Sequence, residues 1–167
     1  MMSIRMQRLL AAAGTGTLAL IVYIITLAPS VDFIDAGELA AVAHGFGIAH
    51  PTGYPLFTML AGVWAWLPLG DGIVRLNLLS AVLAATGVGF LVDALWMLLG
   101  LQLKKNSGKG GKKTAAEQRS TSSGWTRSAA AVIGTLVVAL SRTYWRTALS
   151  IEVYALHMCM LGVLFWA

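Results

Sequence analysis

The segment of the chain best suited to chemistry spans residues 33–55 and reads "FIDAGELAAVAHGFGIAHPTGYP". It carries the carboxylates Asp35 and Glu38 and two histidines, and it contains no Lys or Arg. A carboxylate that is partly removed from water and has no nearby cation binds its proton more tightly, so it can act as a general base near neutral pH. We therefore expect this segment to carry acid–base chemistry.

The spacing of the two carboxylates has two interpretations. Asp35 suits the N-cap of a helix over "DAGELAAVAHG", a Glu three residues later would complete a capping box, and Gly45 would end the helix. Positions three apart also share one face of a helix, so Asp35 and Glu38 can look into one cavity. The spacing alone leaves both interpretations open.

The "HPTGYP" stretch that follows predicts a stiff turn. Each proline biases the residue before it toward extended geometry, and Gly53 permits a tight turn. Such a backbone would hold His50 and Tyr54 in fixed orientations toward a ligand. The alternative is a helix-entry turn that leaves His50 at the lipid headgroups.

The composition is that of an integral membrane protein. Hydrophobic residues make up 57% of the chain and charged residues 11%, whereas a soluble domain carries about 25% charged residues. The mean hydropathy is +0.75. The single Cys159 excludes an intrachain disulfide. The sequence shows no zinc-site spacing, phosphate loop or nucleic-acid motif, so we expect no metal, no other cofactor and no nucleic-acid partner.

Apolar segments define the elements that must position these residues. The first is longer than the apolar part of a signal peptide, about 7–15 residues, which favours an uncleaved helix. The second lies between Pro55 and Pro68, and a helix of that length is too short to cross a hydrocarbon core of about 30 Å. The five segments cover residues 9–28, 55–69, 76–100, 128–140 (running on toward residue 145) and 151–167.

The distribution of Lys and Arg predicts the topology. Nine of the 12 Lys and Arg residues fall on one side if the second segment does not cross, compared with seven at most if every segment crosses. The fold class expected is then an all-α integral membrane protein with about four transmembrane helices plus extracytoplasmic juxtamembrane helices. Residues 1–100 supply the first two spans and an outer loop over 29–75. Residues 101–127 form a disordered basic cytoplasmic linker, and residues 128–167 supply the third span and a truncated fourth.

Other polar residues should gather on the outer side. Arg75 opens the second span and Glu152 starts the fourth, while Arg142 and Arg146 close the third, where snorkelling to the headgroups is the alternative role. A base and cations beside a bilayer suit a reaction that activates a hydroxyl and releases a lipid phosphate, because Arg stabilises charge growing on the phosphate. We expect Asp93 to pair inside the bundle and assign it no role.

Three motifs in order carry a resemblance to a known family. The stretches "DAGELAAVAHGFGIAHPTGYPLFTML", "VRLNLLSAVLAA" and "LSRTYWRTALSIEVYAL" resemble the membrane O-mannosyltransferases whose animal member modifies immunoglobulin-like (IPT) domains of plexins and related receptors, and which have bacterial relatives. The resemblance covers about residues 15–100 and 128–160. It implies a GT-C-like helical bundle in the endoplasmic reticulum membrane of a eukaryote or the plasma membrane of a bacterium.

The resemblance also implies a reaction. Asp35 matches the catalytic base of GT-C glycosyltransferases, with Glu38 as its close alternative. The base would take a proton from a Ser or Thr hydroxyl of an acceptor protein, which attacks the sugar C1 with inversion. The donor is a lipid-phosphate sugar such as dolichyl phosphate mannose, whose phosphate Arg75 would approach. The substrate-binding positions implied are His50, Tyr54, Arg75 and Glu152.

Two departures from the family pattern keep an alternative open. Thr52 stands where the family often has a second proline. The chain also has fewer spans than GT-C enzymes need to complete a donor-lipid groove, and its last apolar run ends without a polar flank. We expect an N-terminal part of an enzyme, completed by further helices or by a partner subunit. The alternative is a truncated, non-catalytic membrane protein or assembly subunit of the same family.

Overall fold

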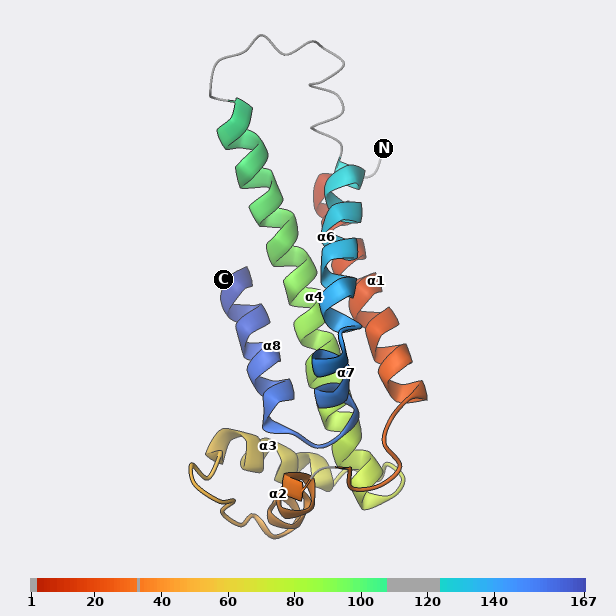
Figure 1. The fold of residues 1–167 in the computed structure, drawn as a ribbon, viewed down its shortest axis with the longest axis vertical. Helices are drawn as coiled ribbons and strands as arrows, with labels where there is room; N and C mark the ends of the chain where they lie inside the picture. Colours follow the sequence, from red (N-terminus) through yellow and green to blue (C-terminus); the bar gives the residue numbers. More distant parts are fainter. Residues whose placement is uncertain (1–2, 33, 108–123) are drawn as a thin grey trace.

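Four helices form an elongated bundle in the computed structural model, which describes residues 3–32, 34–107 and 124–167. Helix α4 (Gly72–Ser107) is its central element, and α1 (Ile4–Ile25), α6 (Gly124–Ala139) and α8 (Val153–Trp166) pack against it (Figure 1). Every regular element in the described residues is a helix. The predicted all-α membrane fold is confirmed.

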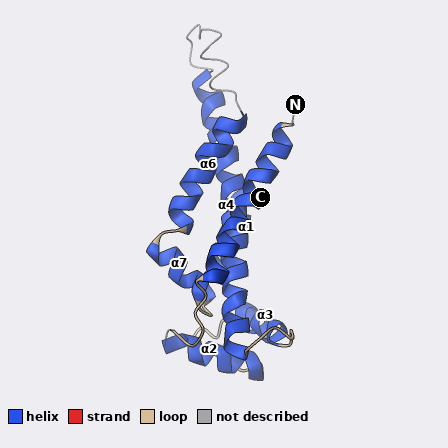
Figure 2. Cartoon of the chain, turned by 90° about the vertical axis from the view of Figure 1, so that its right-hand side faces the viewer, coloured by secondary structure: helices blue, strands red, loops and turns tan. Residues whose placement is uncertain are grey.

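Two short helices form a layer across one end of this bundle. They are α2 (Ile34–Gly45) and α3 (Pro55–Ala65), and both lie at the end where α1 finishes and α4 begins (Figures 1 and 2). We call this the loop end. The opposite end, which holds the starts of α1 and α6 and the last described turn of α4, is called the linker end.

The lengths of the helices decide how many can cross a membrane. By length and composition α1 and residues 72–102 of α4 can cross, and α6 together with the following helix counts as a third span if their bend of 69° is included. The predicted four spans thus become two to three among the described residues, because α8 has 14 residues. Helix α3, with 11 residues, rises about 16 Å, which fits the prediction that its segment does not cross.

Helix α1 is an integral part of the bundle. Its Tyr23 is fully buried, and the hydroxyl donates a hydrogen bond of 2.9 Å to the carbonyl of Ala139 at the end of α6. Thr15 and Ala19 are buried on the same face. Helix α1 therefore contributes buried side chains to the core of the bundle.

The fourth apolar segment breaks where the sequence predicted continuity. Helix α6 ends at Ala139, and α7 (Arg142–Leu149) continues at an angle of 69°. Ser141 causes the break, because it has extended geometry and its side chain caps α7 by accepting a hydrogen bond from the backbone of Tyr144. The bend turns the chain toward α4, where the Tyr144 hydroxyl bonds the carbonyl of Ala84.

Helices extend into both ends of the predicted linker over residues 101–127. Helix α4 continues to Ser107 and α6 begins at Gly124. Leu, Gln and Lys are good helix formers, so α4 runs on past its apolar part. The remainder of the predicted linker, residues 108–123, lies outside the described residues.

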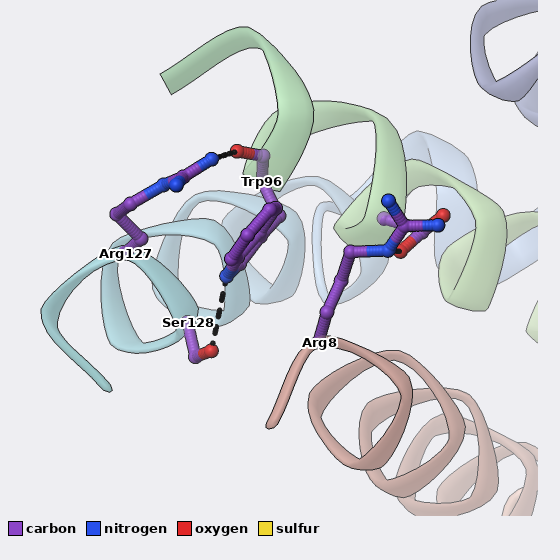
Figure 3. Close-up of polar contacts among 5 residues, drawn as sticks. Arg8, Trp96, Arg127 and Ser128 are labelled. Carbon is purple, nitrogen blue, oxygen red and sulfur yellow. Dashed lines mark hydrogen bonds and ion pairs between the residues drawn. The ribbon is translucent and has the colours of Figure 1, made fainter. Parts of the chain in front are cut away.

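A polar cluster fastens three helices at the linker end (Figure 3). Arg8 of α1 forms an ion pair of 2.7 Å with the buried Asp93 of α4, so Asp93 pairs inside the bundle as expected. The guanidinium of Arg127, from α6, lies 3.5 Å from the ring centre of Trp96 and donates to the Trp96 carbonyl at 2.8 Å. The Trp96 indole donates in turn to Ser128 at 3.2 Å. This cluster is at the far end of the bundle from the candidate site.

Candidate functional site

Asp35 lies open at the loop end. Helix α2 begins at Ile34, so Asp35 stands inside the first turn, where a carboxylate interacts favourably with the helix dipole. The predicted N-cap role, and with it the capping box, is wrong, because the helix begins one residue earlier. Helix α2 ends at Gly45 as predicted. The side chain is exposed, and it makes no hydrogen bond or ion pair with the other described residues.

Glu38, the alternative base, is occupied by His50. Its Oε1 accepts a hydrogen bond of 2.7 Å from the His50 backbone N–H, and its Oε2 lies 2.8 Å from the His50 Nδ1. These bonds, first the side-chain bond and then the backbone bond, lower the pKa of Glu38 below its ordinary value. Glu38 therefore fixes the loop that joins α2 to α3, and Asp35 remains the open carboxylate of the pair.

His50 and Tyr54 lie together on that loop. Their rings meet edge to face, with centroids 5.5 Å apart. Gly53 and Tyr54 both adopt left-handed backbone geometry, at φ of 79° and 44°, just before α3 begins. Such geometry is uncommon for a tyrosine. The surrounding contacts therefore hold the turn in place, which agrees with the stiff turn predicted from the two prolines.

Glu152 reaches the same end from the other side of the sequence. It is the N-cap of α8, outside the apolar helix, and it is 8% exposed. Burial raises the pKa of Glu152, and the negative charge of Asp35 raises it further. Ala36, next to Asp35, packs in one buried cluster with Ile151 and Val153, which flank Glu152. The site thus contains one exposed carboxylate and one buried carboxylate that retains its proton more readily.

Sequence reasoning missed two residues that place Glu152. Asn77 and Ser80 of α4 are completely buried, and both bond the connection between α7 and α8. The available signal was a pair of polar residues three apart inside the apolar run "VRLNLLSAVLAA", which lie on one face of a helix.

Arg75 clamps the turn between α3 and α4. Its Nε and Nη2 donate bonds of 3.1 Å to the carbonyls of Leu69 and Gly70, and its Nη1 donates to the carbonyl of Ala65. The Trp64 indole donates back to the Arg75 carbonyl at 2.8 Å. A guanidinium has five N–H donors, so three of them serve the turn and the others remain for a ligand.

Arg75 also lines an open groove of about 460 Å³. The end of α1, the segment that follows it and the first turns of α4 supply most of its walls, which are largely apolar, as at Ile24, Leu27 and Leu78. The groove therefore pairs a cation with an apolar surface at the loop end. Among the described residues, no three His, Cys, Asp or Glu side chains converge as a metal site would require.

Comparison with known proteins identifies relatives. Residues 35–167 match the family model described as the Protein O-mannosyl-transferase TMEM260 N-terminal domain. The chain is 31% identical over 144 residues to Protein O-mannosyl-transferase TMEM260 of Mus musculus, a match that covers 86% of this chain and 17% of the relative. It is 58% identical over 45 residues to Protein O-mannosyl-transferase tmem260 of Dictyostelium discoideum, covering 27% of this chain and 6% of that protein.

The extent of these matches limits what they describe. The chain spans less than a fifth of the length of either relative. No solved structure matches the chain.

Proposed function

The chain belongs to the Protein O-mannosyl-transferase TMEM260 N-terminal domain family, and from this premise we propose that it is the base-bearing part of a membrane protein O-mannosyltransferase of the GT-C type. The donor is a lipid-phosphate sugar such as dolichyl phosphate mannose. The acceptor is a Ser or Thr hydroxyl of a protein, and the compartment is the endoplasmic reticulum in a eukaryote or the plasma membrane in a bacterium.

The proposed step is a displacement at the sugar. The Asp35 carboxylate takes the hydroxyl proton as the hydroxyl oxygen bonds to C1 of the mannosyl group. The bond from C1 to the phosphate oxygen breaks, and the lipid phosphate leaves with that electron pair. Attack opposite the leaving group inverts C1. Glu152, at the same end of the molecule, is proposed to contact the substrate.

The observation that carries this proposal is the pairing of Asp35 with Glu152. The two residues come from opposite ends of the sequence, yet Ala36, next to Asp35, packs in one buried cluster with Ile151 and Val153, which flank Glu152. The charge of Asp35 also raises the pKa of Glu152. Two nearby carboxyl groups in different environments are the usual basis for separate acid and base roles. The proposal assigns the base to Asp35 rather than to Glu38 because His50 bonds both oxygens of Glu38.

The donor lipid is proposed to enter beside Arg75. The apolar groove that Arg75 lines suits a hydrocarbon chain, and its remaining N–H donors suit a phosphate. His50 and Tyr54 are proposed to position the donor or the acceptor, because their rings stand on the same stiff loop.

The test is transfer by the full membrane protein encoded by the gene, reconstituted in vesicles with dolichyl phosphate mannose and an IPT-type acceptor domain. Asp35→Asn removes the proton acceptor without changing size, so transfer is expected to fall about 100-fold or more. Asp32→Asn, which alters another exposed carboxylate nearby, is the matched control and should retain transfer.

Two outcomes would contradict this proposal. Transfer retained in Asp35→Asn would exclude Asp35 as the base. No transfer by the unmodified protein with these substrates, despite correct insertion, would favour the alternative, a non-catalytic membrane protein or assembly subunit.

A further inference from the structure

Asn77 joins two segments that approach the site from different parts of the chain. Its Nδ2 donates to the carbonyls of Ala28 and Ser30, at 2.9 and 3.4 Å. Its Oδ1 accepts a bond of 2.8 Å from the backbone N–H of Ile151. The first segment follows α1 and leads to Asp35, and the second ends at Glu152. One buried side chain thus bonds the backbone on both sides of the carboxylate pair.

Two further bonds complete this connection. The backbone N–H of Ala28 donates to the carbonyl of Leu149 at 3.1 Å, so the two segments also bond each other directly. The hydroxyl of Ser80, one turn after Asn77 on the same helix, accepts a bond of 3.2 Å from the backbone N–H of Glu152. The position of Glu152 is therefore set by α4 rather than by α8 alone.

We infer that Asn77 is a positioning residue that sets Glu152 beside Asp35 for the transfer reaction. This inference rests on the proposed function only for its catalytic consequence, because the placement of Glu152 can be measured without turnover. A side-chain amide supplies both donors and an acceptor, and the three backbone groups it meets require both. A hydrocarbon side chain supplies neither, and an ionised carboxylate lacks the donors.

The environment of Glu152 provides a readout of this placement. Dicyclohexylcarbodiimide modifies protonated carboxyl groups in apolar surroundings, and buried Glu152 is the expected target. If Asn77 is changed to Leu, the connection loosens and Glu152 moves toward water, where its carboxyl group loses its proton more readily. Modification of Glu152 at neutral pH, measured by mass spectrometry of its peptide, should then fall about tenfold for each unit by which its pKa drops.

The second readout is the rate of transfer. Asn77→Leu in the full membrane protein should lower kcat about 100-fold, because a small misplacement of a reacting group has an effect of that size. KM should change much less, because Asn77 is buried and contacts no substrate. Asn77→Asp is the conservative variant. A buried Asp that keeps its proton supplies one donor and one acceptor, so it should retain more Glu152 modification and more transfer than Leu.

Controls separate positioning from a general loss of structure. Thr86→Val removes a hydroxyl of α4 that bonds only its own helix, at 2.7 Å, and should change neither readout. Ser80→Ala removes only the bond to the Glu152 backbone and should lower both readouts less than Asn77→Leu. If Asn77→Leu does not insert into the membrane, Glu152 modification and kcat in Ser80→Ala and Asn77→Asp test the positioning role instead.

The outcomes distinguish this inference from the proposed function. Unchanged Glu152 modification in Asn77→Leu would overturn the inference, and so would lowered modification with unchanged kcat. If the unmodified protein transfers no sugar, the proposed function fails. Glu152 modification alone then decides whether Asn77 positions that carboxylate.

Discussion

Glu38 and Glu152 are at the same end of the molecule, and their pKa values are shifted in opposite directions. Hydrogen bonds from His50 favour the ionised form of Glu38, so its pKa is lowered. Burial favours the neutral form of Glu152, so its pKa is raised. Ionised Glu38 therefore stabilises the folded loop at neutral pH, whereas ionisation of Glu152 as the pH rises through its raised pKa disfavours the folded arrangement.

The Glu38 effect gives a prediction with a definite sign. Because its pKa in the folded protein is below the ordinary 4.5, its contribution is present above that value and is lost as the pH falls through the lowered pKa. At about pH 6 the His50 amide should be more protected from hydrogen exchange in the unmodified chain than in Glu38→Gln. The difference should shrink in strong acid.

The Thr58 amide of α3, which bonds the Tyr54 carbonyl, serves as the internal control. Equal His50 exchange in both proteins at about pH 6 would show that Glu38 does not hold the loop.

At the scale of the elements, the linker-end cluster adds polar bonds to the hydrophobic packing around Val92, Trp96 and Ala131. Figure 3 shows Arg8 reaching α4 from α1, while Arg127 reaches the same helix from α6. Gly100 makes room for this, because a Cβ there would lie 2.0 Å from the Arg127 guanidinium. The cluster joins helices that the chain itself connects only through long segments.

A double-mutant cycle tests the ion pair between α1 and α4. Asp93→Ala leaves Arg8 without its partner and should destabilise the bundle by about 2 kcal/mol. Breaking a fully buried pair costs about 3–5 kcal/mol. The cost here is smaller because the Arg8 side chain is 26% exposed. The double variant Arg8→Ala, Asp93→Ala should be more stable than Asp93→Ala alone, because it leaves no unpaired charge. The measurement is the unfolding midpoint in detergent, with the exposed Asp71→Ala as control. A double variant whose loss equals the sum of the single losses would show that the pair does not couple.

Elements defined by a long apolar run were predictable from the sequence. Helix α1 and the apolar part of α4 follow directly from hydropathy, and the failure of α3 to cross follows from its two flanking prolines. The bend after Ala139 was not predicted, because hydropathy averages over a single capping residue. The signal was local: Ser141 precedes a polar turn that it can cap.

The site was predictable only where its residues are close in sequence. Asp35, Glu38 and His50 share one short segment, so their shared location was expected, but spacing could not show that Glu38 binds His50 rather than a helix N-terminus. The Asn77 contacts join residues 49 and 74 positions away. Such contacts depend on how α1, α4 and α8 pack, and no local pattern encodes that packing.

At the scale of the whole molecule, the candidate site residues gather at one end. Helix α2 and the starts of α4 and α8, which carry Asp35, Arg75 and Glu152, are at the loop end (Figures 1 and 2). The starts of α1 and α6, which carry Arg8 and Arg127, are at the linker end. The positive-inside rule predicts a cytoplasmic linker end, and we propose on this basis that the candidate site faces the opposite compartment.

This orientation is testable by labelling. With Cys159 replaced by Ser, a cysteine at the exposed Thr52 should react with an impermeant maleimide only from the extracytoplasmic side. A cysteine at the exposed Ser3 should react only after the membrane is permeabilised. Labelling of both from the same side would place α1 outside the membrane and contradict the topology.

The hydrogen bond between Tyr23 and Ala139 can form only late in synthesis of the chain. The hydroxyl and its acceptor are separated by 116 residues, and ribosomes add about 5–20 residues per second. Helix α1 is therefore made about ten seconds before the carbonyl that completes it. During that interval the Tyr23 hydroxyl has to bond lipid, water or the insertion machinery. Assembly of the site waits longer still, because Glu152 is synthesised after α6. A ribosome that pauses between α4 and α6 would thus leave Asp35 in the membrane without Glu152.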